Sequence, residues 1–74
     1  MKCKSEIRVY GDTKQIIRCF EAEEKRKEDR SRLNIVEKKD HVLFEVEADD
    51  PTALRATLNG ITRLLIVFEK MEKI

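Results

Sequence analysis

The sequence predicts a single α+β domain, residues 1–74, with the element order β-α-β-β-α. Three segments alternate apolar and polar residues with period two, as strands with one solvent-exposed face do. Two other segments repeat apolar residues every three or four positions, as helices do. Each of these helical segments begins with an aspartate, which is a favoured residue for capping a helix N-terminus.

The first strand and the first helix are expected in the N-terminal third. Cys3, Ser5, Ile7 and Val9 alternate with Lys4, Glu6 and Arg8. Gly11 breaks this pattern, and Asp12 with Gln15 three positions later predicts a capping box. The apolar stripe of the following helix consists of Ile16, Ile17 and Phe20. Because no apolar residue continues the stripe, the helix should end between positions 22 and 27.

Two further strands are expected to form a hairpin. One begins at Leu33, and the next buries alternate residues Val42, Phe44, Val46 and Ala48. Residues 38–41 form a short polar connection without the Asn-Gly or Asp-Gly of the tightest turns. His41 lies at this turn, where we expect it to be exposed rather than to bind a ligand.

The last helix begins at Asp50-Pro51, an N-cap followed by proline at the first helical position, and should run to about residue 73. At about 100° per residue, one apolar stripe lies within roughly 40° of Leu54 and should pack on the sheet. It consists of Leu54, Leu58, Ile61, Leu65 and Phe68. A second group, Leu64, Val67 and Met71 with Gly60, widens the apolar arc to about half the circumference. Ile66 adds an apolar side chain on the polar side.

This arc is wider than a three-stranded sheet and one short helix can cover. The first helix could cover the excess, or the excess could be a docking surface for another protein. We expect the docking surface to include Leu64, Ile66, Val67 and Met71 with Ile17 of the first helix.

A polar row lies on the remaining side of the last helix. Arg55, Asn59 and Arg63 are spaced at i, i+4 and i+8, so they share one face. Such a row could bind a phosphate or a carboxylate. It could equally pair with local acids such as Asp49, Asp50 and Glu69.

Charge is the strongest feature of the composition. Charged residues make up 42% of the chain, but 16 basic and 15 acidic side chains nearly cancel. Nine of the ten residues at 21–30 are charged, with mixed signs. This segment is expected to be a solvated helix end and loop, or alternatively a basic arm that contacts RNA through Lys25, Arg26, Lys27 and Arg30.

A chain of 74 residues has a small core, and proteins of this size often gain stability from disulfides, metals or oligomerisation. Two cysteines, Cys3 and Cys19, and one histidine are too few for a closed zinc site within one chain. We expect reduced thiols, no metal and no cofactor, which leaves oligomerisation. No export signal or membrane-spanning run is visible, so a cytoplasmic location is expected.

The residues do not form a catalytic set. There is no Ser/His/Asp or Cys/His group and no glycine-rich phosphate loop, so we expect that the protein is not an enzyme. The two glycines, Gly11 and Gly60, are far apart and cannot form the G-x-x-G loop of a KH module. Phe44 is on the expected core face, so no aromatic stacking platform for RNA is predicted.

The segment 48–60, followed by Arg63 and an apolar tail to Met71, resembles the small dimerisation subunit of the archaeal and eukaryotic KEOPS complex. The resemblance rests on an acidic pair at the helix start and on the stretch Leu54-Arg55-Ala56-Thr57-Leu58-Asn59. An Arg-x-Arg strand entry at Arg30 and Arg32 and the strand at 42–47 precede it. Archaeal members are about this short. The charged segment 21–30 and the hairpin turn without glycine depart from the family pattern.

The resemblance implies a three-stranded antiparallel sheet with two helices packed on one face, and a homodimer. It also implies that each copy docks on the catalytic subunit of KEOPS, the ATP-dependent threonylcarbamoyl transferase. That assembly makes N6-threonylcarbamoyladenosine at position 37 of tRNA, and the small subunit would bridge two catalytic subunits and support tRNA binding. Two alternatives remain from the residues alone: a stand-alone small RNA-binding module and a small-ligand regulatory domain.

Overall fold

The structure, a computed structural model, describes residues 1–21 and 30–72. Its elements are β1 (Cys3–Tyr10), α1 (Thr13–Glu21), β2 (Ser31–Glu37), β3 (His41–Ala48) and α2 (Pro51–Glu72). The predicted α+β class and the order β-α-β-β-α are therefore confirmed. The range predicted for the end of the first helix, positions 22 to 27, lies outside the described residues.

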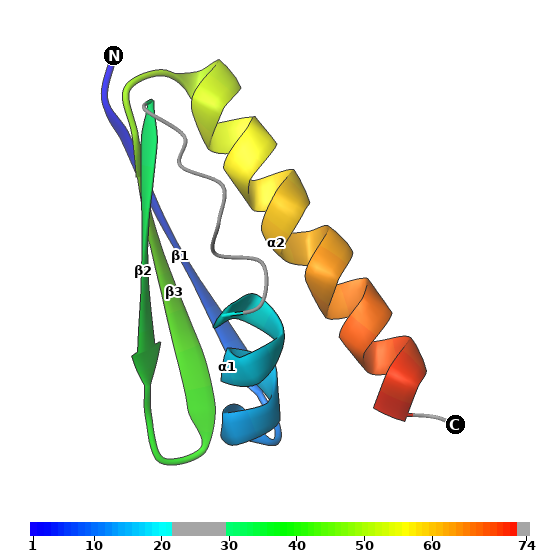
Figure 1. Cartoon of the computed structure of the whole chain (residues 1–74). Helices are drawn as coiled ribbons and strands as arrows, with labels where there is room; N and C mark the ends of the chain where they lie inside the picture. The colour runs from blue at the N-terminus through cyan, green and yellow to red at the C-terminus, as the bar shows by residue number, and fades with distance from the viewer. Residues whose placement is uncertain (22–29, 73–74) are drawn as a thin grey trace.

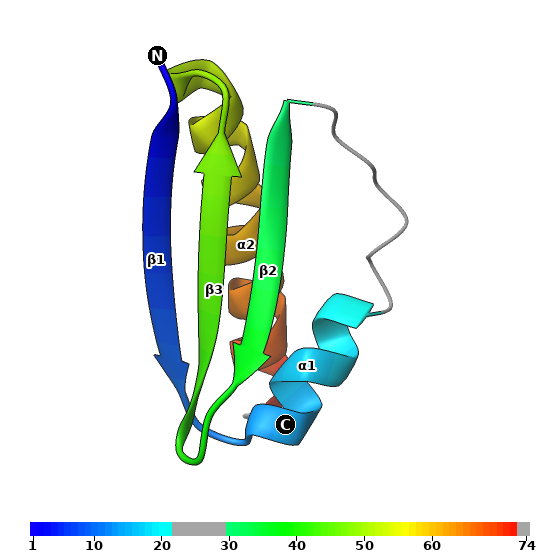
Figure 2. The ribbon, with the colours of Figure 1, turned by 90° about the vertical axis from the view of Figure 1, so that its left-hand side faces the viewer.

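The three strands form one antiparallel sheet in the order β1-β3-β2. The predicted hairpin pairs Glu37 with Val42 at its closed end, and β1 pairs along the other side of β3 from Tyr10–His41 to Cys3–Ala48. Strands β1 and β2 therefore run parallel to each other on the two sides of β3. Figure 2 shows this arrangement with the open face of the sheet toward the viewer.

Both helices cover the same face of the sheet, as the resemblance implied (Figure 1). The N-terminal end of α2 lies close to the sheet, and α1 lies between the sheet and the C-terminal half of α2. The core forms in this layer: Val42, Phe44, Val46 and Ala48 of β3 are at most 2% exposed, and they pack with Ile16, Phe20 and Ile61. The Phe20 and Phe44 rings stack at 4.6 Å between centroids.

Two predicted helix caps are confirmed. The Asp12 carboxylate accepts a hydrogen bond from the Gln15 backbone N–H at 3.3 Å, and the Asp50 carboxylate accepts one from the Ala53 N–H at 2.8 Å. These bonds satisfy N–H groups that the first turn of a helix leaves without a partner.

Strand β2 begins two residues earlier than predicted. Ser31 is buried, and its Oγ accepts a hydrogen bond from Thr57 Oγ1 of α2 at 2.7 Å. Polar Ser31 and Arg32 gave no apolar alternation, but the backbone pairs with Ala48 and Glu47 of β3 and extends the strand. Over the described residues, no helix is long and apolar enough to span a membrane.

Candidate interaction site

The C-terminal half of α2 exposes apolar side chains. Ile66 is 53% exposed, Val67 46% and Met71 62%. Val67 and Met71 are one helical turn apart and therefore share one flank of α2, whereas Ile66 lies toward the outer side. We call Val67 and Met71 the distal patch. These side chains are exposed because α2 diverges from the sheet toward its C-terminal end (Figure 1).

The other two residues expected at the docking surface are placed differently. Leu64 and Ile17 are only half-buried, but both pack against the core cluster. The excess arc of α2 is thus divided: Leu64 contributes to the core, and the distal patch stays exposed. Gly60, which belongs to the same arc, is exposed, and a Cβ placed there would meet no other atom within 4 Å.

The polar row of α2 is solvent-exposed. The side chains of Arg55, Asn59 and Arg63 form no hydrogen bond or ion pair within the part of the chain that the structure describes. The local acids have other partners: Asp50 forms an ion pair with Arg30, and Asp49 accepts a hydrogen bond from Arg32 Nη2 at 2.9 Å. The row therefore presents two cations without a neutralising carboxylate.

Strand β2 begins among basic residues that are neutralised. Arg32 also donates to Glu47 through Nε at 3.2 Å. The hydrogen bond from Arg32 holds the pKa of Asp49 below its ordinary value, and the bond to Asp49 raises the pKa of Arg32. Lys25, Arg26 and Lys27 of the expected RNA-contacting arm lie outside the described residues. Its described member, Arg30, is paired with Asp50.

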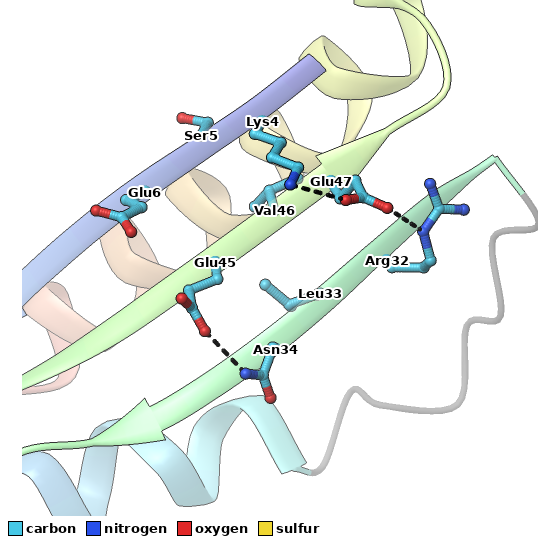
Figure 3. A pocket seen from close by; sticks show the side chains of 9 residues that line it. All are labelled: Lys4, Ser5, Glu6, Arg32, Leu33, Asn34, Glu45, Val46 and Glu47. Carbon is cyan, nitrogen blue, oxygen red and sulfur yellow. Dashed lines mark hydrogen bonds and ion pairs between the residues drawn. The ribbon is translucent and has the colours of Figure 1, made fainter. Parts of the chain in front are cut away.

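The open face of the sheet carries a shallow hollow of about 380 Å³ (Figure 3). Its charged side chains pair across the strands: Lys4 Nζ lies 3.5 Å from Glu47, and Asn34 donates to Glu45 at 2.8 Å. The charge of Lys2 lowers the pKa of Glu47, and the hydrogen bond from Arg32 lowers it further. The hollow therefore neutralises its own charges. Its lining residues are Lys4, Ser5, Glu6, Arg32, Leu33, Asn34, Glu45, Val46 and Glu47.

His41 is more enclosed than the sequence suggested. It is the first residue of β3, its side chain is only 18% exposed, and its ring lies 4.9 Å from that of Tyr10. Its Nδ1 is 2.8 Å from Asp40 Oδ1, and this hydrogen bond lowers the pKa of Asp40. The expectation of an exposed histidine is corrected because Tyr10 of β1, which pairs opposite His41, packs against the ring.

Groups suited to metal binding or disulfide formation do not assemble in the described part. No three His, Cys, Asp or Glu side chains converge there as a metal site, and Cys3 and Cys19 are free thiols. The Ser31–Thr57 link was not predicted from the sequence. Its only signal is that a serine and a threonine face each other once β2 and α2 are packed, which requires the tertiary fold.

The fold and these surfaces together define a small α+β domain that presents an exposed apolar patch, a row of unpaired cations and an open sheet face. The Pcc1 family, described as "Transcription factor Pcc1", matches residues 11–72. The chain therefore belongs to the Pcc1 family, a family of non-catalytic KEOPS components linked to tRNA modification. No curated protein matches the chain. The predicted resemblance is thus confirmed at the level of the family.

Proposed function

We propose that this chain is a homodimeric, non-catalytic scaffold subunit of a KEOPS complex. In this role it bridges two catalytic subunits during N6-threonylcarbamoyladenosine synthesis at position 37 of tRNA and supports tRNA binding. Membership of the Pcc1 family supports the complex. The observation that carries the docking role is the distal patch, which exposes two neighbouring apolar side chains at the end of α2.

The distal patch fits a protein partner better than it fits solvent. An amphipathic helix docks through apolar residues at i, i+3, i+4 and i+7 spacing, and Leu64, Val67 and Met71 have this spacing. Leu64 already touches the core, so a partner that covers Val67 and Met71 would extend the existing core without a gap. Ile66 would contact the partner at the outer margin, and Ile17 would support the surface from α1.

Replacing Val67 and Met71 by aspartate tests this assignment. We expect the double variant to lose co-purification with the KEOPS catalytic subunit, because two carboxylates would be buried without partners in the interface. The protein should remain folded, since both positions are exposed. Thermal unfolding followed by circular dichroism checks this.

A matched control is Thr52→Asp with Thr62→Asp, which places two carboxylates on exposed positions of the same helix. This control should retain the catalytic subunit. Full retention by the distal-patch variant would contradict the docking role.

The row of Arg55, Asn59 and Arg63 is the proposed tRNA contact of the assembled complex. Its arginines lack carboxylate partners within the described residues, which favours contact with phosphate over a structural ion pair. A cytoplasmic location belongs to the same proposal, supported by the two free thiols. The stand-alone RNA-binding alternative is weaker, because Arg30 and Arg32 are already paired with acids.

A further inference from the structure

Strand β1 leaves one long edge of the sheet unpaired. It is the terminal strand in the order β1-β3-β2, and no described element lies along its outer side (Figure 2). Its register with β3 is continuous over all eight residues, so there is no bulge, and the strand contains no proline. Edge strands usually carry such features because a regular edge offers free N–H and C=O groups to another strand.

The core is also incomplete along this edge. The inward side chains of β3 are fully buried, whereas Ile7 and Val9 of β1 are only half-buried. α1 packs near the opposite side of the sheet, against β2 and β3, where Thr13 Oγ1 donates to Glu37 at 2.9 Å. A further strand beside β1 would cover the apolar surface that the two helices leave open.

The charges on the open face of β1 alternate in sign. Lys4, Glu6 and Arg8 follow one another at every second position. Arg8 Nη2 lies 3.2 Å from Glu6 Oε1, and both side chains remain about half exposed. Each can therefore accept a second partner of opposite charge from a neighbouring strand.

We propose that a second copy of this chain pairs antiparallel along β1, with the twofold axis passing through Ile7, to form a continuous six-stranded sheet. This rests on the homodimer in the proposed function and specifies its interface. With this register, Glu6 lies opposite Arg8 of the second copy, and Ile7 lies opposite its own counterpart on the helix-covered face. Lys4 lies opposite Tyr10, whose exposed ring can accept a cation.

Neighbouring registers are less favourable. An axis through Glu6 places Glu6 opposite Glu6, and an axis through Arg8 places two arginines opposite each other. Like charges directly opposite are destabilising. An axis through Ser5 pairs Lys4 with Glu6 but shortens the overlap and brings Lys2 opposite Arg8. The Ile7 register alone combines a long overlap with complementary charges.

A charge-swap series tests the register in the full-length chain. Glu6→Arg and Arg8→Glu each place like charges opposite at two symmetric positions. Each should raise the dimer Kd about tenfold, measured by sedimentation velocity across a dilution series. The double variant Glu6→Arg/Arg8→Glu restores both the pair within the strand and the pairs between copies, so its Kd should return to the unmodified value. Arg18→Glu, at an exposed position of α1, is the control and should leave the Kd unchanged.

Disulfide trapping provides a second measurement. In a Cys3→Ala/Cys19→Ala background, a mixture of the Glu6→Cys and Arg8→Cys chains should form the mixed disulfide faster than either chain crosslinks to itself. A dimer whose Kd ignores both single reversals and that forms no mixed disulfide overturns the β1 interface but leaves the proposed homodimer standing. A chain that stays monomeric up to high concentration overturns both.

Discussion

Arginine side chains near the sheet and arginine side chains on α2 differ in what lies opposite them. Arg30 and Arg32 face the carboxylates of Asp50, Asp49 and Glu47. Arg55 and Arg63 face none within the described residues. Exposed ion pairs contribute only about 0–1 kcal/mol to folding, so the main consequence is for the surface potential. The positive potential of the described surface is therefore concentrated on the outer side of α2.

Charge reversal of Arg55 and Arg63 tests whether this potential serves tRNA. In the assembled complex, Arg55→Glu/Arg63→Glu should weaken tRNA binding and lower the slope of log K against log salt by about 1 for each phosphate that is no longer bound. Filter binding or fluorescence anisotropy between about 50 and 200 mM salt would measure this, because phosphate binding is strongly salt-dependent over that range. Lys38→Glu/Lys39→Glu, at the hairpin turn, is the charge-matched control. Equal affinity for all three complexes would eliminate the tRNA role of the row.

Local residue signals were readable from the sequence, and tertiary ones were not. The caps at Asp12 and Asp50 were predictable because each bond joins residues three positions apart. The enclosure of His41 was not, because it depends on Tyr10, which is distant in sequence and adjacent only through strand pairing. The Ser31–Thr57 bond was missed for the same reason.

Among the elements, α2 shows how far periodicity alone can locate a surface. The seam that includes Ile61 was predicted correctly, because an α-helix places residues at i, i+4 and i+7 on one side. The sequence could not divide the remaining arc. That division depends on α1, which lies between the sheet and the C-terminal half of α2 and leaves Leu64 packed but Val67 and Met71 exposed (Figure 1). Whether the exposed part binds a partner stays a prediction.

Gly60 tests the stability of α2 separately from its contacts. Glycine inside a helix costs about 0.5–1 kcal/mol relative to alanine, and a Cβ at this position would meet nothing. Gly60→Ala should therefore raise the free energy of unfolding by about that amount, measured by urea denaturation. Gly11→Ala should lower it, because Gly11 has a φ of +151°, which alanine rarely adopts. A destabilised Gly60→Ala chain would show that this flank of α2 is more crowded than the described residues indicate.

At the scale of the whole molecule, the sheet separates two different surfaces. Its helix-covered face holds the core, and its open face carries acids and bases that neutralise one another (Figure 3). The class and element order could be predicted from pattern, but the strand order β1-β3-β2 could not, since it depends on which edge of the hairpin receives β1. The paired charges of the open face were equally hidden, because they join residues of different strands.

The open-face carboxylates predict a loss of stability in acid. The folded-state pKa values of Glu47 and Asp49 are lowered by Lys2 and Arg32. Their contribution is therefore complete above the unfolded pKa values of about 4 and is lost as the pH falls through the lower folded values. Thermal unfolding between about pH 6 and pH 2.5, a range that brackets these values, should show this decline.

Two variants isolate the effect. Asp49→Asn removes the titrating group, and Arg32→Gln removes the cation that lowers its pKa. Each should flatten the decline below about pH 4. An unchanged pH dependence in both variants would mean that the Arg32–Asp49 pair contributes nothing to folding in solution.

The strand order also has a consequence for how the molecule forms. The β2–β3 hairpin joins neighbours such as Glu37 and Val42, whereas β1 must pair Tyr10 with His41 across the whole of α1 and β2. Closing the longer loop costs more entropy, so we expect β1 to join a hairpin that already exists. The strand that we propose links two copies would then be the last to order. Association between copies would be coupled to completion of the fold, and a chain that fails to place β1 would lack the surface needed to assemble.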